Sequence, residues 1–117
     1  MKVCLTQNSV YPVYEWENGV RVIFPPYGPT KGEPYGILGF LDQIETRVFS
    51  IGDEVEFRRR HDNSLIEYDE LSSVLNQEPA IGLRIVSMLR QDGKFVRRGK
   101  HTFMFSGKIT EIRDVNV

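Results

Sequence analysis

The sequence predicts an all-β protein, a small β-barrel with one short helix. Residues 54–58 alternate strictly between charged and apolar side chains, which is typical of a strand with one buried face. Two dipeptides, Asn18-Gly19 and Asp92-Gly93, lie between apolar runs and tolerate the positive φ angles of tight hairpins. Only residues 68–76 show helical spacing of apolar side chains. Strands therefore dominate the prediction.

The first third of the chain predicts three strands and a loop. Residues 1–5 form a short edge strand, and residues 10–16 form another edge strand because Pro12 cannot donate to a ladder. A tight turn then leads to a strand at residues 20–24. Four prolines and two glycines make residues 25–34 an irregular loop, since each proline removes a donor and each glycine loosens the backbone.

The central stretch predicts a succession of short strands, and the rest of the chain is organised around it. Residues 35–41 carry aromatic and β-branched side chains, with Gly36 and Gly39 at expected bends or close backbone approaches. A second strand covers residues 47–49 and a third covers residues 54–58. The polar residues 61–64 then turn the chain into a short strand at residues 65 and 66.

Residues 68–76 are the one expected helix. Asp69 is placed to cap its first turn, and Leu71, Val74 and Leu75 recur at helical spacing. We expect this short amphipathic segment to lie across one opening of the barrel.

The last part of the chain predicts a strand at residues 80–89, a hairpin turn at residues 91–94 and a strand at Phe95-Val96. A long strand follows at residues 102–112, and Gly107 within it indicates a bend or bulge. A chain of 117 residues is normally one domain, so residues 1–117 are expected to form a single β-barrel domain.

Charge and cysteine content limit the function classes. The net charge is −1, so bulk electrostatics neither requires nor excludes nucleic acid, but seven basic residues between Ile81 and Lys108 face one acid, Asp92. Cys4 is alone, and no Cys/His cluster has metal-ligand spacing, so we expect no disulfide and no metal site. No apolar stretch approaches the length of a membrane span. The expected location is the cytoplasm or nucleus.

Three short motifs resemble those of a cold-shock domain, and more closely the noncanonical cold-shock domains of the Unr family of RNA-binding translational regulators. They are a glycine-aromatic strand at residues 32–40, a G-D-x-V-x-F strand at residues 51–57, and an A-x-x-I strand at residues 80–85. The resemblance covers residues 19–86, with residues 87–117 as a basic hairpin or extension. Residues 105–109 also look like the opening strand of such a domain. The resemblance implies an OB-like five-stranded barrel in an RNA-binding assembly.

Cold-shock domains bind single strands by stacking bases on outward aromatic rings, and this chain departs from both stacking motifs. Only Tyr35, Phe40 and Phe49 remain as candidate platforms, and a place in the core is the favoured alternative for each. The resemblance to noncanonical members of the family implies that this chain contributes rigidity, domain arrangement or protein contacts more than base stacking. The basic candidates for phosphate binding are Arg58, Arg59, Arg60, Arg97, Arg98, Lys100 and His101.

Two functions follow as expectations. The first is an RNA-associated binding module in translational control or messenger-RNA handling, which binds single-stranded RNA with weak to moderate affinity. The alternative is a protein-interaction barrel that acts as a scaffold or adaptor without direct nucleic-acid binding, with protein partners in a ribonucleoprotein, and that pairs with another chain by β-addition. We predict no enzyme, since no nucleophile-base pair, metal set or phosphate loop is present; no catalytic residue, cofactor or membrane partner is expected.

Overall fold

The computed structural model describes residues 1–52, 54–96 and 102–116 of the chain, except the side chain of residue 17. Six strands build a barrel: β1 (Lys2–Thr6), β2 (Val10–Glu15), β3 (Arg21–Ile23), β4 (Tyr35–Leu41), β8 (Arg84–Gln91) and β10 (Phe103–Asp114). The other elements are β5 (Thr46–Ile51), β6 (Glu54–Arg59), β7 (Leu65–Ile66), β9 (Lys94–Phe95), the 3-10 turns η1 (Glu17–Gly19) and η2 (Tyr68–Glu70), and the helix α1 (Leu71–Val74).

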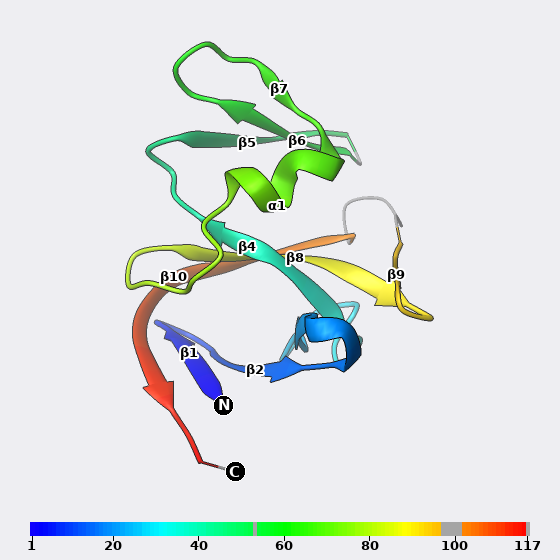
Figure 1. Cartoon of the computed structure of the whole chain (residues 1–117), viewed down its shortest axis with the longest axis vertical. Coiled ribbons are helices and arrows are strands. Elements are labelled where there is room, and N and C mark those ends of the chain that lie inside the picture. Colours follow the sequence, from blue (N-terminus) through cyan, green and yellow to red (C-terminus); the bar gives the residue numbers. More distant parts are fainter. Residues whose placement is uncertain (53, 97–101, 117) are drawn as a thin grey trace.

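The barrel is a closed ring of antiparallel strands in the order β10-β1-β2-β3-β4-β8, and β10 also pairs with β8 (Figure 1). Closure depends on the length of β10. Its first half pairs with β8, its second half pairs with β1, and the register shifts between Phe105 and Lys108. That irregularity surrounds Gly107, where the sequence predicts a bulge. The predicted all-β barrel with one short helix is confirmed.

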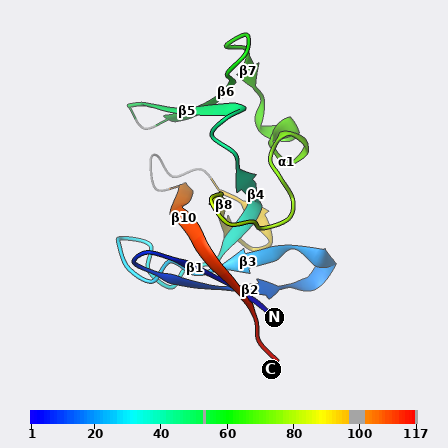
Figure 2. The same ribbon diagram turned by 90° about the vertical axis from the view of Figure 1, so that its left-hand side faces the viewer.

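A second sheet stands outside the barrel. After Leu41 the chain leaves β4, forms the three-stranded sheet β5-β6-β7 and the helix α1, and returns to the ring at Arg84. In two perpendicular views this sheet lies above the barrel, with α1 between the two (Figures 1 and 2). This inserted segment covers the outer face of part of the ring.

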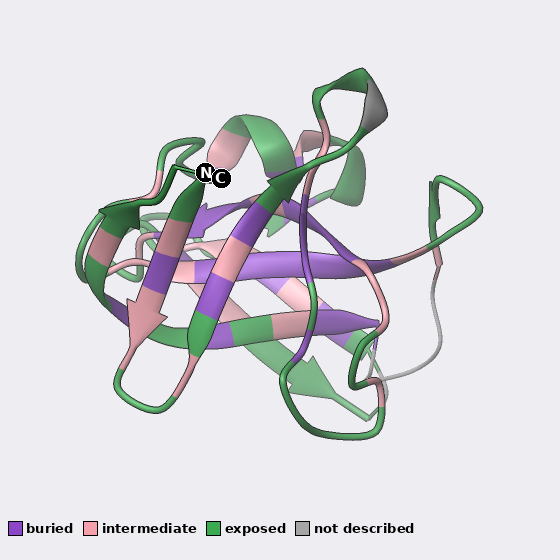
Figure 3. Ribbon diagram, turned by 90° about the horizontal axis from the view of Figure 1, so that it is seen from below, coloured by how far each residue is buried: buried purple, intermediate pink, exposed green. Residues whose placement is uncertain are grey.

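The architecture creates two hydrophobic clusters (Figure 3). One fills the barrel and consists of Cys4, Tyr11, Val13, Ile23, Tyr35, Ile37, Phe40, Ile85, Leu89 and Ile109. The other lies between the barrel and the inserted segment and consists of Leu41, Val55, Phe57, Ile66, Leu71, Leu75, Val86, Met88 and Phe103. Strand β8 contributes to both, which explains its continuous buried run from Ile85 to Leu89.

The glycines of β4 lie at close approaches, as predicted. The pairing of β4 with β8 shifts between Ile37 and Gly39, so the strand bends there. A Cβ on Gly36 would lie 2.7 Å from Cδ of Arg90, and one on Gly39 would lie 2.5 Å from Cβ of Leu75. Only glycine lets these neighbours pack so tightly on the strand.

Both predicted hairpins are confirmed. Strands β2 and β3 pair around η1, where Asn18 and Gly19 have φ angles of 69° and 73°. Strands β8 and β9 pair around Asp92 and Gly93, with φ angles of 52° and 75°.

The predicted edge positions of the first two strands are wrong. Strand β1 pairs with β10 and β2, and β2 pairs with β1 and β3, so neither is an edge. Pro12 lies opposite Val3 in the ladder. Local sequence favoured an edge because proline lacks a donor, but ring closure by β10 places β2 inside the barrel wall.

The predicted helix is shorter than expected, and it lies against the outside of the barrel instead of across an opening. It consists of η2 and the four residues of α1, and its start is capped by Glu67 and Glu70 rather than by Asp69. Leu71 and Leu75 pack into the cluster on the outside of the barrel instead of across an opening. The expected five-stranded ring also differs from the six strands observed, because β5 and β6 belong to the separate sheet.

Candidate nucleic-acid interface

A groove of about 430 Å³ is lined by residues of both sheets. Strand β5 and the end of β6 contribute one side, while β4, β8 and β10 contribute the other. We call it the arginine groove; its lining residues are Leu41, Gln43, Thr46, Arg47, Val48, Phe49, Arg60, Arg84 and Phe105. No carboxylate is among these described residues, so the groove is cationic.

Two of its three arginines are held by backbone carbonyls. Arg47 Nη2 donates to the carbonyl oxygen of Arg60 at 3.2 Å, and Arg84 Nη1 donates to that of Ser106 at 3.2 Å. The Nε atoms of Arg47 and Arg84 are shielded from solvent and have no hydrogen-bond partner among the described residues. Buried donors of this kind are costly unless an acceptor reaches them. The two guanidinium groups nevertheless bring positive charge to the groove lining.

The groove also lies at the end of a stack of aromatic rings. Tyr68 stacks on Phe103 with centroids 5.6 Å apart and planes at 28°, and Phe103 stacks on Phe105 at 6.2 Å and 21°. We call these three rings the aromatic ladder. Phe105 remains 36% exposed in the groove, and Phe49, also in the lining, is 39% exposed. Two rings are therefore available beside the guanidinium groups.

Strand β5 is an edge of its sheet and runs along the groove. The N–H of Arg60 donates to the carbonyl oxygen of Glu45, whereas the N–H of Arg59 donates to Ser64 on the opposite side of β6. Because backbone groups alternate along an antiparallel strand, those of Val48 and Ser50 point away from β6. The groove thus combines side-chain cations with an edge of backbone donors and acceptors.

The structure brings two of the predicted site residues together in this groove, Phe49 and Arg60. Tyr35 and Phe40 require a correction. They are 1% and 0% exposed, both belong to the barrel core, and neither ring offers a face to a base. Tyr35 donates its hydroxyl hydrogen to Thr30 Oγ1 at 2.8 Å, and the guanidinium of Arg21 lies 5.3 Å from the centre of the Phe40 ring.

Two further basic candidates, Arg58 and Arg59, do not belong to the groove lining. Arg58 is paired with Glu56 at 3.1 Å, and Arg59 is paired with Glu70 at 3.3 Å. The backbone N–H of Glu67 and the guanidinium of Arg59 lower the pKa of the Glu70 carboxyl below its ordinary value. Both arginines are thus partly neutralised by carboxylates. Arg97, Arg98, Lys100 and His101 lie outside the described residues.

Sequence reasoning missed Arg47, Arg84 and Phe105 as members of one site. Arg47 and Phe49 are two positions apart on a strand, a spacing that places both side chains on one face. That alternation was the available signal within β5. The contributions of β8 and β10 depend on how the inserted segment packs against the barrel, which no local pattern encodes.

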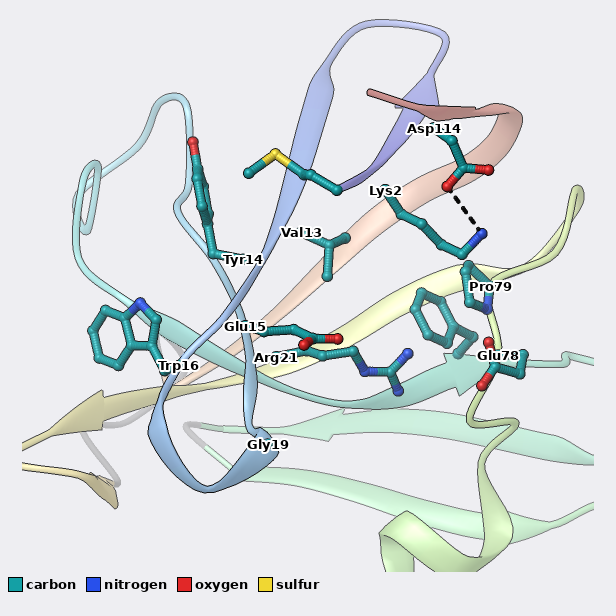
Figure 4. Close-up of a pocket in the computed structure, with 12 residues that line it drawn as sticks. Lys2, Val13, Tyr14, Glu15, Trp16, Gly19, Arg21, Glu78, Pro79 and Asp114 are labelled. Atoms are coloured by element: carbon teal, nitrogen blue, oxygen red, sulfur yellow. Dashed lines mark hydrogen bonds and ion pairs between the residues drawn. The ribbon is translucent and has the colours of Figure 1, made fainter. Parts of the chain in front are cut away.

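A larger pocket of about 850 Å³ opens at one end of the barrel (Figure 4). Its charged lining residues are mixed: Lys2 is paired with Asp114 at 3.4 Å, Arg21 lies opposite Glu15 on the paired strands, and Glu78 adds a carboxylate. Three carboxylates against two basic side chains make this pocket less suited to a polyanion than the arginine groove.

Within the described ranges, no group of three or more His, Cys, Asp or Glu residues could hold a metal ion. No helix in those ranges has the length and apolar character that a bilayer crossing requires. Comparisons with protein-family models, curated proteins and solved structures give no match.

Proposed function

We propose that the chain is an RNA-associated binding module that holds single-stranded RNA in the arginine groove. The observation that supports this proposal is the composition of the groove: three guanidinium groups beside two part-exposed rings, with no carboxylate among the described lining residues. Cationic grooves lined with aromatic rings are the usual means of holding single strands without strict sequence preference.

Each component has a chemical task. The guanidinium groups of Arg47, Arg60 and Arg84 pair with phosphate oxygens. A base stacks on the exposed face of Phe105 and thereby extends the aromatic ladder by one ring. Such stacking is worth about 1–3 kcal/mol per base.

The geometry favours a single strand over a duplex. A base stacks on a protein ring only when it is splayed out of its own helix, and duplex bases are not. The groove also offers few cations, so affinity is weak to moderate. The proposed setting is translational control or messenger-RNA handling, in the cytoplasm or nucleus, as part of a ribonucleoprotein.

The test is a titration of labelled single-stranded RNA against three groups of variants at several salt concentrations. Arg60→Gln removes the exposed cation of the groove, and Phe105→Ala removes the exposed ring. On single strands, the logarithm of the affinity falls with the logarithm of the salt concentration by about 0.7 for each neutralised phosphate. The three groove arginines therefore contribute a slope of about 2, and we expect a smaller slope for Arg60→Gln. Phe105→Ala lowers affinity by about tenfold with the slope retained.

Matched controls are an exposed arginine and an exposed ring elsewhere. Arg113→Gln breaks a surface pair with Glu111 on the far part of β10, and Tyr27→Ala truncates a ring in the loop after β3. Both leave RNA affinity unchanged. The third variant converts Arg97, Arg98 and Lys100 to Glu. We expect it to bind RNA more weakly than the native chain, because it replaces three positive charges by negative ones. Loss of affinity in the controls alone, or in the triple variant alone, places the site outside the groove.

A second candidate function is supported by the edge of β5. Because the backbone groups of Val48 and Ser50 point away from β6, an extended peptide can add to β5 as a fourth strand. Ser50→Pro removes one edge donor without removing a β5–β6 bond, so it separates the two functions. If Ser50→Pro binds RNA normally but no longer captures a peptide partner, the protein-interaction function is favoured. If Arg60→Gln loses RNA binding while Ser50→Pro behaves as the native chain does, the RNA-binding function is favoured.

A further inference from the structure

A pocket of about 700 Å³ lies on the outer face of the barrel, between α1 and the hairpin of β8 and β9. In Figure 1, α1 lies above β4 and β8, and β9 lies to their right at the end of β8. Tyr68 lines this pocket, and Phe105 lines the arginine groove, so the two sites lie at opposite ends of the aromatic ladder. We call it the α1–β9 pocket.

The base of the pocket is apolar. Its apolar side chains come from three elements and include Leu38, Leu71 and Met88. A pocket of several hundred cubic ångströms with such a lining has the size and character of sites for small organic molecules.

One wall is built by an arginine stacked on a ring. The Arg90 guanidinium carbon lies 4.7 Å from the centre of the Phe95 ring, and both side chains rest on Gly36. A Cβ on Gly36 would lie 2.9 Å from Cε1 of Phe95, so glycine is required for this wall. Phe95 is exposed, which leaves part of the ring accessible. The wall is therefore preformed and amphipathic.

The polar groups of the pocket are mainly donors. Arg90 Nη2 donates to the carbonyl oxygen of Gly93, while its Nε is shielded from solvent and has no partner among the described residues. Arg21, on another side of the pocket, donates to the carbonyl oxygen of Gln77 at 2.6 Å. Asp69 is the single carboxylate of the lining. Two guanidinium groups and one carboxylate around an apolar base fit an anionic group attached to an apolar body.

From this arrangement we propose that the α1–β9 pocket binds a small amphipathic anion, whose apolar body lies on the base and whose acidic group pairs with Arg90. A neutral apolar molecule would gain nothing from the positive charge of Arg90, and a compact inorganic anion would leave the apolar base exposed to water. Carboxylates and phosphate monoesters share the required chemistry. This site is separate from the arginine groove and does not depend on RNA binding.

The probe is 1-anilinonaphthalene-8-sulfonate, an aromatic monoanion whose fluorescence rises in apolar surroundings. Titration of the full chain gives the stoichiometry and dissociation constant, and amide chemical-shift changes locate the probe. We expect one site, with shifts at Ile37, Leu38 and Met88. Decanoate and phenyl phosphate, used as competitors, distinguish carboxylate from phosphate sources, and decanol tests whether the charge is needed.

Five variants test the pocket without disturbing a core. Ser72 and Ser73 are adjacent exposed residues of α1. Of these two, Ser72 lines the pocket and Ser73 does not. Ser72→Trp fills the pocket and Ser73→Trp is its control. Arg90→Met keeps the aliphatic stem over Gly36 but removes the charge, Arg90→Lys restores it, and Arg113→Met is the control at an exposed arginine.

The expected result is a loss of affinity of about tenfold or more in Ser72→Trp and Arg90→Met, since a hydrogen bond to a charged group contributes that much. The two controls bind as the native chain does, and Arg90→Lys recovers part of the loss. Shifts located at the barrel-end pocket or the arginine groove overturn the proposal. Equal affinity in Ser72→Trp and Ser73→Trp, or equal competition by decanol and decanoate, also overturns it. We expect RNA binding to be unchanged in these variants. Failure of the pocket proposal can therefore be distinguished from failure of the proposed RNA-binding function.

Discussion

Gly39 and Leu75 approach each other so closely that a Cβ on the glycine would lie 2.5 Å from Cβ of the leucine. The segment after α1 is bonded to β4 at this point. Phe40 N donates to Asn76 O at 2.7 Å, and Asn76 N donates to Phe40 O at 3.1 Å. Since Asn76 O would also lie 2.9 Å from the added Cβ, backbone as well as side chain would have to move. This contact fastens the inserted segment to the barrel.

Gly39→Val is therefore expected to destabilise the fold by about 1–3 kcal/mol, because the inserted segment must shift or lose its bonds to β4. Urea denaturation at equilibrium measures the change. Gly107→Ala is the matched control, since its Cβ would meet Thr6 at 3.6 Å, an ordinary contact. Equal stability of the native chain and Gly39→Val would show that the segment is not tightly fastened here.

Phe40→Ala is expected to act through stability and not through RNA affinity. The ring is fully buried in the barrel core, and removal of a buried Phe costs about 3–5 kcal/mol. The fraction that remains folded binds RNA as the native chain does, because the Phe40 ring is buried in the barrel core and is not part of the groove lining. Denaturation and RNA titration are carried out on the same preparation. A fully folded Phe40→Ala variant that has lost RNA binding contradicts both assignments.

Alkaline conditions are expected to destabilise the protein through Cys4. Burial raises the pKa of its thiol above the ordinary value of 9.0, so the native state keeps a proton that the unfolded chain releases. The free energy of unfolding is therefore constant with respect to this group below pH 9.0 and falls as pH rises above that value. Burial raises the pKa of Tyr11 in the same way, starting from 10.0.

The measurement is the free energy of unfolding as a function of pH for the native chain and for Cys4→Ala. The variant is less stable at neutral pH because a buried side chain is truncated, but its stability falls less steeply above pH 9.0. Reaction of the native thiol with a disulfide reagent is also slow and accelerates in denaturant. Identical pH profiles would show that Cys4 titrates normally.

Local patterns in the sequence predict most of the individual elements. Alternation at residues 54–58 marks β6, with Val55 and Phe57 buried, and two dipeptides with positive φ mark the hairpins. What they do not predict is which strands pair at long range. The motifs at residues 32–40 and 51–57 are consecutive in sequence, yet β4 enters the ring while β6 enters the outer sheet.

The candidate site was predictable only in part for the same reason. Arg60 and Phe49 belong to a local run of charge and a local strand, and both line the groove. Tyr35 and Phe40 occupy inward positions of β4, a choice of face that depends on the bulge beside Gly39. Arg84 and Phe105 are distant in sequence from β5 and meet it only through tertiary packing.

The pairing of β1 with β10 has a kinetic consequence. Lys2 and Asp114 are 112 positions apart and lie opposite each other, so the barrel cannot close until nearly the whole chain is present. Contacts of such long sequence separation slow folding, because loop entropy is lost before the contact forms. During synthesis on the ribosome, β1 and β8 each keep one unpaired edge until β10 has been made. The barrel wall is therefore expected to close only after β10 has been synthesised.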